Sequence, residues 1–451
     1  MSNRLVSIRV HNSSARLDAT GPNAVRLRQA LPEMNIPHPD HVATVVLLTT
    51  TNTYRSLPFA AAAEKLGLKV HWGVDLPAPL ADEWNIALPL DFRDIAKAVR
   101  TLTVLAKQES IAAVIALDDA ATVVAAQASA RLGLPHNSPS AALAARDKLI
   151  MRKRLQAGGV LCPGFGAFPL QADPTGIAAQ SSYPCVLKPL LLNGSRGIIR
   201  ANNPVEFEIA WQRIGAILRK SVGTDILVED YIPGKELAVE ALLSEDGLCV
   251  LAIFDKPDPL EGPFFEETIY VTPSRLSPDE QDEVLVATRE AARVLGLRFG
   301  PVHAEFRLNK QGVWPIEVAG RSIGGLCSRT LRFRSGVSLE ELILRQATGS
   351  SIEGLIIESG SRGAMMIPIP ERGILRGFTG IEAAEALAYI EQVEITAKLN
   401  YPLYPLPEGD GYLGFIFARA DTPAKVEAAL RRAHSQLHFE IDAEIAVKPA
   451  Q

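Results

Sequence analysis

A segment near the middle of the chain places carboxylates inside an otherwise apolar hairpin. Residues 303–325 read HAEFRLNKQGVWPIEVAGRSIGG, in which two alternating runs flank the turn sequence NKQG. We predict a three-residue loop over residues 310–312, closed by Gly312 in the left-handed conformation. This loop would pair Asn309 with Val313 and fix the register of both strands.

The predicted register sets two carboxylates opposite each other. Counting from the loop, Glu305 pairs with Glu317, with Cβ atoms about 5 Å apart on one face of the hairpin. Two such charges repel by about 3 kcal/mol at an effective dielectric constant of about 20. A hard divalent cation, which prefers oxygen ligands, would remove this repulsion. A solvated face on which the carboxylates point apart is the alternative, and this segment alone leaves both open.

A second segment combines a lysine with a glycine-containing loop. Residues 183–203 read YPCVLKPLLLNGSRGIIRANN, which predicts a strand, a loop and a second strand. Glycines let backbone N–H groups approach an anion closely, and Lys188 or Arg196 would add positive charge. The pattern is therefore compatible with a phosphate site, while a flexible hairpin tip remains the alternative.

Two further segments could extend a nucleotide site. Lys148 lies on a predicted helix with several other basic residues, a pattern that favours a solvated face. Residues 226–243, ILVEDYIPGKELAVEALL, lead a strand into a PGK turn with carboxylates on both sides. Backbone groups there could contact a base, and a carboxylate could contact ribose hydroxyls. The GxxxxGK[ST] and GxGxxG fingerprints do not occur in the sequence.

In this order and spacing, the four segments resemble the ATP-grasp superfamily over about residues 145–350. The resemblance implies a ligase that uses ATP and Mg²⁺ (or Mn²⁺). The residues that it implies for ATP binding are Lys148, Lys188, Gly194, Ser195, Gly197, Glu229, Tyr231, Ile232 and Glu236. The lysines and the glycine loop would hold the phosphates, residues 229–232 would face the adenine, and Glu236 would face the ribose.

The resemblance also gives roles to the hairpin. Glu305 and Glu317 would ligate Mg²⁺, and Arg321 would be catalytic, because it would hold the transferred phosphate and stabilise the oxyanion. The family commonly has an asparagine two residues after the second glutamate, whereas this chain has Ala319. This departure leaves the number of bound metal ions open.

Residues 261–277, EGPFFEETIYVTPSRLS, and residues 362–441 resemble bacterial L-amino-acid ligases, which join two amino acids into a dipeptide through an acyl phosphate. On this resemblance Glu267 would pair with a substrate ammonium group, with Glu266 as the alternative residue. The segment from Arg321 to Gly325, including Gly324, would receive a substrate carboxylate. Three alternatives stay open: a solvated pair at Glu266 and Glu267, a ligase for a non-amino-acid carboxylate, and a nucleotide-binding regulatory protein without turnover.

The elements that position these residues follow from the hydrophobic patterns. Strands alternating with helices from residue 41 predict a doubly wound parallel α/β domain over residues 41–140. An extension over residues 1–40 would precede it. An ATP-grasp domain over residues 141–350 would include a lid at about residues 150–225, and a C-terminal α+β domain would occupy residues 351–451.

Several local expectations accompany this division. Asp118 and Asp119 follow a strand, and we predict that they cap the next helix rather than contact a ligand. His303 is expected to be hydrogen-bonded rather than a catalytic base. The C-terminal domain is predicted to contain a helix over residues 381–392 and a helix that starts at Pro423.

Composition limits the class of protein. The chain has 451 residues, 47% of them hydrophobic, and a net charge of −5, which is ordinary for a soluble globular protein. No strongly basic face is implied, so we expect small-molecule substrates (amino acids and ATP) and no nucleic-acid partner. No signal peptide or bilayer-spanning run is visible, so the expected location is cytoplasmic. The four cysteines lack metal-ligand spacing and are expected to be reduced thiols. A homodimer is the expected assembly.

Overall fold

Alternating strands and helices form the first part of the described chain. The computed structural model describes residues 42–83, 86–219, 224–352 and 356–443, so the predicted extension lies outside the described residues. A parallel sheet has the order β3-β2-β1-β4 and contains β1 (Thr44–Thr49), β2 (Lys69–Asp75), β3 (Leu88–Leu90) and β4 (Ile111–Ala116). The accompanying helices are α1 (Ser56–Lys65), α2 (Ala78–Glu83), α3 (Ile95–Gln108), η1 (Asp119–Ala121), α4 (Thr122–Leu132) and α5 (Pro139–Arg146). The predicted parallel α/β fold of this region is confirmed.

A small antiparallel sheet follows the helix α6 (Lys148–Ala157). Its strands have the order β5-β8-β6-β7 and are β5 (Phe165–Pro169), β6 (Cys185–Pro189), β7 (Ile199–Ala201) and β8 (Asp225–Asp230). Two helices accompany it, α7 (Pro174–Gln180) and α8 (Pro204–Leu218). Most of this sheet lies within the range predicted for the lid.

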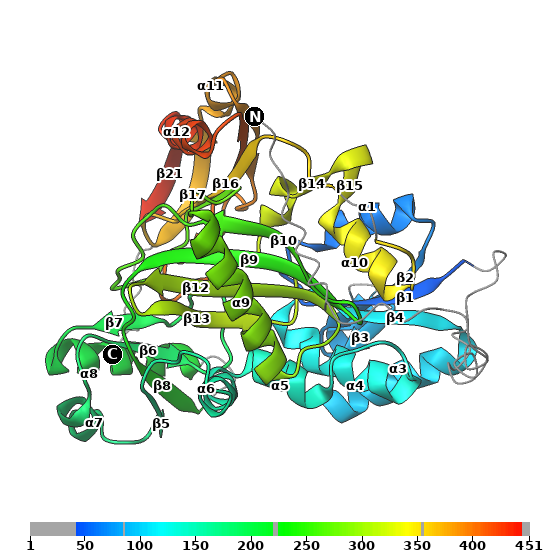
Figure 1. The fold of residues 1–451 in the computed structure, drawn as a ribbon, viewed down its shortest axis with the longest axis horizontal. Helices are drawn as coiled ribbons and strands as arrows, with labels where there is room; N and C mark the ends of the chain where they lie inside the picture. The colour runs from blue at the N-terminus through cyan, green and yellow to red at the C-terminus, as the bar shows by residue number, and fades with distance from the viewer. Residues whose placement is uncertain (1–41, 84–85, 220–223, 353–355, 444–451) are drawn as a thin grey trace, which may run out of the picture. The chain divides into compact units, whose positions relative to one another are not determined.

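A large antiparallel sheet supports the rest of the chain (Figure 1). Its order is β13-β12-β9-β10-β11-β16-β20-β18. The strands are β9 (Lys235–Ser244), β10 (Gly247–Asp255), β11 (Ile269–Thr272), β12 (Gly300–Asn309), β13 (Gly312–Ala319), β16 (Ser361–Ile367), β18 (Ile390–Ile395) and β20 (Gly414–Ala420). Because β11 pairs with β16, the sheet continues across residue 350, where the sequence predicted a domain boundary.

Helices and short strands complete the fold. Helix α9 (Pro278–Leu295) packs on β10, β12 and β13, and α12 (Pro423–His434) packs on β11, β16, β18 and β20 (Figure 1). The remaining elements are η2 (Cys327–Thr330), β14 (Arg332–Phe333), η3 (Arg334–Gly336), β15 (Val337–Ser338), α10 (Leu339–Ala347), β17 (Gly373–Thr379), α11 (Ile381–Glu385), β19 (Pro402–Leu403) and β21 (His438–Ala443). None of the described helices combines the length and apolar composition needed to cross a bilayer.

The β12–β13 hairpin corrects the predicted turn but keeps the predicted carboxylate pair. Asn309 pairs with Gly312, so the loop has two residues rather than three. A bulge between the pairs Glu305–Glu317 and Phe306–Pro315 then shifts the register by one residue. The turn prediction was wrong, yet Glu305 lies opposite Glu317 because the bulge restores the expected spacing.

The C-terminal region contains a second correction. The helix predicted over residues 381–392 ends at Glu385, and β18 begins five residues later, at Ile390. Tyr389 separates the two with a φ of +76°, which a right-handed helix does not allow. The predicted start of α12 at Pro423 is confirmed, with Thr422 as its N-cap.

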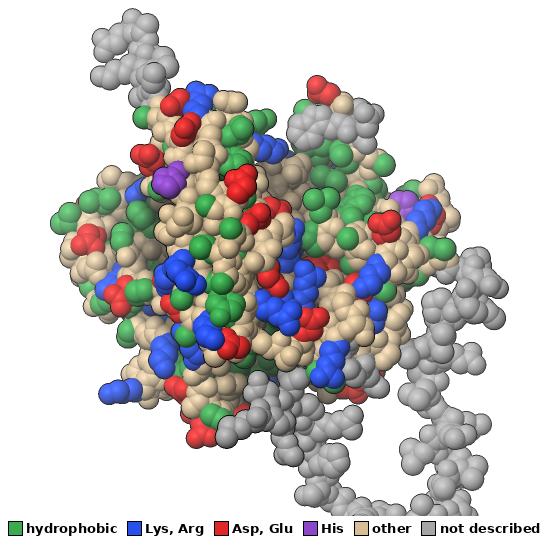
Figure 2. All heavy atoms as spheres, turned by 90° about the horizontal axis from the view of Figure 1, so that it is seen from above, with side chains coloured by type: hydrophobic (Ala, Val, Ile, Leu, Met, Phe, Trp, Pro, Cys, Tyr) green, Lys and Arg blue, Asp and Glu red, His purple; other side chains and the backbone are tan. Residues whose placement is uncertain are grey.

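The face in Figure 2 shows how charges are distributed. Lys and Arg side chains of the described residues are interspersed there with Asp and Glu side chains. The four cysteines are free thiols, as expected.

One hydrophobic cluster joins residues from all three predicted domains. It includes Leu47 of the parallel sheet, Leu242 of β9 and Phe415 of β20, each no more than 1% exposed. The ring centroid of Phe415 lies 5.4 Å from that of Tyr54, in an edge-to-face arrangement. An added Cβ at Gly325 would lie 2.9 Å from the Phe415 ring, so this ring also supports the segment after β13.

We therefore predict that Phe415→Ala lowers the free energy of unfolding by about 3–5 kcal/mol, because it leaves a cavity in a closed core. Chemical denaturation monitored by circular dichroism measures the change. Val286→Ala is the matched control, since Val286 is 55% exposed and should alter stability little. Equal effects of the two substitutions would contradict the packing described here.

Candidate active site

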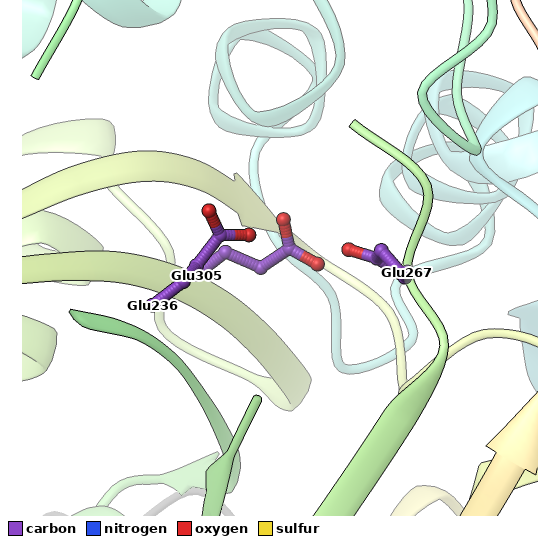
Figure 3. Close-up of side chains that lie close together, drawn as sticks. All are labelled: Glu236, Glu267 and Glu305. Atoms are coloured by element: carbon purple, nitrogen blue, oxygen red, sulfur yellow. The ribbon is translucent and has the colours of Figure 1, made fainter. Parts of the chain in front are cut away.

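A lysine lies among three glutamates at one end of the large sheet. The Lys256 ammonium is 3.0 Å from Glu236, 2.5 Å from Glu267 and 3.1 Å from Glu305. The carboxylate oxygens lie within 4.8 Å of one another, and Figure 3 shows them converging from separate segments. Tyr270 also donates a hydrogen bond to Glu267 at 3.0 Å. The charge of Lys256 allows these acidic groups to lie close together.

The pKa values in this cluster follow from burial and charge. Burial raises the pKa of Glu267, the charge of Glu305 raises it further, and the resulting value is about 7 despite Lys256. Burial alone would lower the pKa of Lys256, but the surrounding carboxylates raise it well above its usual range. Lys256 was not anticipated, because a lone lysine after a strand has no distinctive pattern.

The second hairpin glutamate faces a different lysine. Glu317 lies opposite Glu305 in the ladder, and its carboxylate is 4.0 Å from the Lys148 ammonium. Lys148 is 7% exposed and donates to the Leu192 carbonyl at 2.6 Å. The expectation of a solvated helical face was therefore wrong for Lys148, which connects the hairpin with the glycine loop.

The glycine loop is ordered by contacts with two other regions. Gly194, Ser195 and Gly197 have φ values of +59°, +55° and +73°, and such turns expose backbone N–H groups. Asn193 donates to Asp119 at 3.2 Å. The Gly197 N–H donates to the Pro407 carbonyl at 2.9 Å, so this amide already has an acceptor.

A loop of the C-terminal region lies against the glycine loop. Arg196 donates to the Glu408 carbonyl at 2.9 Å, and Arg213 pairs with the Glu408 carboxylate at 2.6 and 2.9 Å. These contacts fix the position of the glycine loop. They favour an ordered loop over the flexible hairpin tip that was the alternative from the sequence.

Lys188 lies beside Glu229 rather than in open solvent. The Lys188 ammonium is 2.6 Å from Glu229, and Arg152 donates to both Glu229 oxygens at 2.6 and 3.2 Å. Burial would raise the pKa of Glu229, but the charges of Arg152 and Lys188 outweigh it and lower the pKa to about 2. Glu229 thus holds two cations, and the expectation that it faces the adenine stays a prediction. Arg152 was noted only as part of a basic helix.

Two backbone groups of the segment predicted to face a nucleoside already have hydrogen-bond partners within the protein. The Tyr231 N–H donates to the Pro184 carbonyl at 3.0 Å, and the Ile232 carbonyl accepts from Arg307 at 2.8 Å. Arg307 also donates to Glu236 at 2.9 Å. Glu236 therefore contacts two cations, and a ribose hydroxyl would have to share its oxygens with Arg307 and Lys256.

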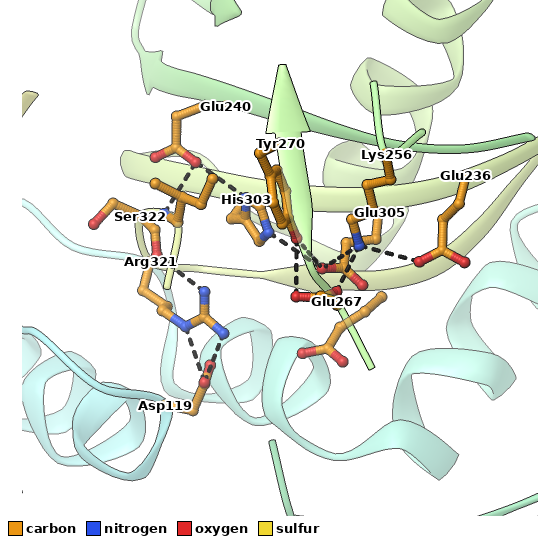
Figure 4. A network of polar contacts seen from close by, with 12 residues as sticks. Asp119, Glu236, Glu240, Lys256, Glu267, Tyr270, His303, Glu305, Arg321 and Ser322 are labelled. Atoms are coloured by element: carbon orange, nitrogen blue, oxygen red, sulfur yellow. Dashed lines mark hydrogen bonds and ion pairs between the residues drawn. The ribbon is translucent and has the colours of Figure 1, made fainter. Parts of the chain in front are cut away.

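Arg321 pairs with an acidic residue of the parallel α/β region (Figure 4). Its Nε and Nη2 atoms lie 2.9 and 2.8 Å from one oxygen of Asp119. Asp118 instead accepts from backbone and hydroxyl groups of Thr49, Thr50 and Thr53. Neither aspartate side chain caps a helix, so the capping prediction was wrong for both.

His303 links the two ends of this polar network. It lies 3.1 Å from Glu240 and 3.4 Å from Glu305, and it is 5% exposed. Burial would lower the pKa of His303, but hydrogen bonds that its ring donates to both glutamates outweigh that effect and raise it. The expected hydrogen-bonded histidine is confirmed.

Contacts thus bring the predicted residues together in three sets. Tertiary contacts join Lys148 with Glu317 and the glycine loop, and join Lys188 with Glu229. Contacts around Lys256 join Glu236, Glu267 and Glu305, so Glu267 faces an internal ammonium group. Gly324 and Gly325 lie in the segment that follows Arg321.

Three family models match this chain over separate parts of its length. They describe an ATP-grasp N-terminal domain at residues 61–136, an ATP-grasp domain at residues 181–330, and the L-amino acid ligase C-terminal domain 2 at residues 365–442.

The chain contains an ATP-grasp domain.

Proteins similar to this chain include ligases. The crystal structure of an L-amino acid ligase from Bacillus licheniformis matches with a TM-score of 0.75 and 26% identity, over 89% of this chain and 99% of that one. An uncharacterised protein of Sinorhizobium fredii is 24% identical over 68% of this chain and 64% of its own length. A D-alanine–D-alanine ligase of a Marinomonas species is 29% identical over 43% of this chain and 61% of its own length. The chain thus spans less than two thirds of either of these two relatives.

The buried ion pairs of the ATP-grasp region predict a pH-dependent stability. Because the pKa of Glu229 is about 2 when folded and near 4.5 when unfolded, its pairs stabilise fully above about pH 4.5 and are lost as pH falls towards 2. We expect Glu229→Gln to lower the free energy of unfolding by about 3–5 kcal/mol at neutral pH. The deficit relative to wild type should shrink by about 1–2 kcal/mol near pH 3.5.

Denaturant unfolding at a series of pH values measures this difference. Glu290→Gln is a suitable control, because Glu290 forms an exposed pair with Arg293. A Glu229→Gln deficit that stays constant with pH would contradict the assignment.

A second prediction concerns Lys256. Lys256→Met removes the cation among the carboxylates, so the folded pKa values of Glu267 and Glu305 should both rise. A raised carboxyl pKa costs stability as pH increases, so the Lys256→Met deficit should grow by about 2 kcal/mol from about pH 5 to about pH 8. Added Mg²⁺ should raise the melting temperature of this variant more than that of wild type.

Thermal unfolding with and without MgCl₂ checks both effects. Lys69→Met is the matched control, since Lys69 pairs with Glu109 but is half-exposed. A Lys256→Met variant with wild-type pH dependence would show that Lys256 does not neutralise the cluster.

Proposed function

We propose that this protein is an ATP- and Mg²⁺-dependent ligase that joins two amino acids through an acyl phosphate, releasing ADP and phosphate. The observation that carries this proposal is that Glu317 lies opposite Glu305 on the β12–β13 hairpin and 4.0 Å from Lys148. Arg321 follows this hairpin closely enough for both glutamates to affect its charge. The match of residues 365–442 to an L-amino acid ligase domain supports amino acids as the substrates.

The donor set fits a hard divalent cation. Glu305 and Glu317 are directly opposed on one hairpin face, and carboxylate oxygens are the ligands that Mg²⁺ prefers. Glu305 and Glu317 would hold the ion, which would neutralise phosphate charge during transfer. Ala319 supplies no ligand atom, so water or phosphate oxygens would complete the coordination.

Positive side chains and backbone amides would position ATP. Lys148 donates to the Leu192 carbonyl, just before the glycine loop, and Glu229 holds Lys188 in place. Gly194 and Ser195 would direct backbone N–H groups towards phosphate oxygens. Phosphoryl transfer depends mainly on such positioning and charge neutralisation, so these residues supply what the first step needs.

The second step requires an amine to attack the acyl phosphate. Arg321, fixed by Asp119, would stabilise the oxyanion that forms at the attacked carbon. Glu267 would accept the substrate ammonium group in competition with Lys256. Binding of the substrate would then require the Lys256 cluster to rearrange.

The direct test is to incubate the protein with MgATP and pairs of the twenty amino acids, and to measure ADP, phosphate and product masses. We expect phosphate release only with particular pairs, together with the mass of the matching dipeptide. Phosphate release that depends on a non-amino-acid carboxylate would contradict the substrate assignment, and ATP binding without any release would contradict the ligase assignment.

Variants test the residue roles. Glu305→Gln and Arg321→Met should each lower kcat by about 100-fold or more, because each removes a charge needed in the transition state. The exposed Glu290→Gln variant should retain the wild-type rate.

A further inference from the structure

A buried arginine of the α/β region has no place in the site described above. Arg55 lies just before α1 and is 8% exposed. One terminal nitrogen, Nη1, donates to the Leu117 carbonyl at the end of β4. Its Nε and Nη2 atoms have no protein acceptor within the described ranges.

The acidic residues near Arg55 are committed to other partners. Asp118 accepts from three threonines, and Asp119 holds Arg321 and Asn193. Glu240 accepts from His303 and from the Ile323 N–H through Oε2, while its buried Oε1 has no hydrogen-bond partner among the described residues. None of the described carboxylates forms an ion pair with Arg55, although all three lie close enough to affect its charge.

An unpaired guanidinium is unfavourable in this environment. Burial lowers the pKa of Arg55, and the nearby positive charge of Arg321 lowers it further, to about 10. A buried charge is normally paired because desolvation costs several kcal/mol. The free N–H groups at Nε and Nη2 of Arg55 can therefore bind an anion that is not part of the protein.

The position of Arg55 indicates which anion this is. A Cβ added at Gly324 would lie 3.7 Å from Nη2 of Arg55, so the guanidinium reaches the segment after Arg321. A planar guanidinium beside an uncrowded glycine backbone suits a carboxylate, which accepts two parallel hydrogen bonds.

We propose that Arg55 binds the carboxylate of the amino acid whose amine attacks the acyl phosphate. This carboxylate does not react, so it must be held through both steps, and Arg55 holds it from the α/β region while the amine faces the hairpin. The inference rests on the proposed ligase function and adds a residue that neither the sequence motifs nor the comparisons assign. The transferred phosphoryl group is the other anion that Arg55 could bind, and the test below distinguishes it from the carboxylate.

The test compares the attacking amino acid with its carboxamide, which lacks the negative charge. Wild type should prefer the acid by about 100-fold in kcat/KM, as expected for a buried charge pair. Arg55→Met should lose this preference by raising KM for the acid, whereas KM for ATP should not change. The ratio of kcat/KM for the acid to kcat/KM for the carboxamide is compared between variants. This comparison cancels the different reactivities of the two amines.

Two variants control for structural damage. Arg55→Lys keeps the charge and should retain part of the preference. Arg362→Met removes another buried arginine, one that pairs with Glu358 and Glu391, and should keep the full preference. An Arg55→Met enzyme that keeps the preference would overturn the proposal. Equal loss of kcat with acid and carboxamide would instead place Arg55 at the phosphoryl group.

Failure of the ligase proposal gives a distinct result. Wild type would then release no phosphate with any amino-acid pair. Calorimetric titration tests the carboxylate site without turnover. Wild type and Arg55→Lys are titrated with amino acids and with carboxamides, in the presence of a non-hydrolysable ATP analogue. An acid preference that is present in wild type and weakened in Arg55→Lys supports the carboxylate site, and its absence in wild type overturns it.

Discussion

Carboxylates that are buried close together repel one another unless a cation lies among them. Lys256 lies among Glu236, Glu267 and Glu305, which come from separate segments of the large sheet and the loop before β11. Because these charges are desolvated, their mutual repulsion without the ammonium group would be strong. The rest of the site depends on this balance, since Glu305 also belongs to the opposed pair on the hairpin.

The same constraint organises the phosphate side of the site. Glu229 compensates Arg152 and Lys188, and Asp119 compensates Arg321. Each acidic residue therefore fixes the position of at least one cation, and under the proposed function Lys188 and Arg321 would meet a phosphate and an oxyanion. Arg55 departs from this pattern, since no described carboxylate pairs with it, and the departure is what points to a ligand.

Shared packing connects these groups across the chain. The large sheet runs from the hairpin strands to β18 and β20, and one hydrophobic cluster includes residues of the parallel sheet, β9 and β20. Contacts from Glu408 and Pro407 reach the glycine loop from the C-terminal region. Segments that are distant in sequence therefore determine the position of the candidate ATP site.

The sequence alone determined the parallel α/β region, the order of the ATP-grasp motifs and the opposition of Glu305 to Glu317, because these depend on local patterns. It misjudged the hairpin loop, the helix after residue 381 and the roles of Asp118 and Asp119. Only the tertiary structure decided that Lys256, Arg152 and Asp119 are the charge partners of the site. The physical reason is that pairing of buried charges depends on contacts between segments far apart in the chain, which local spacing does not record.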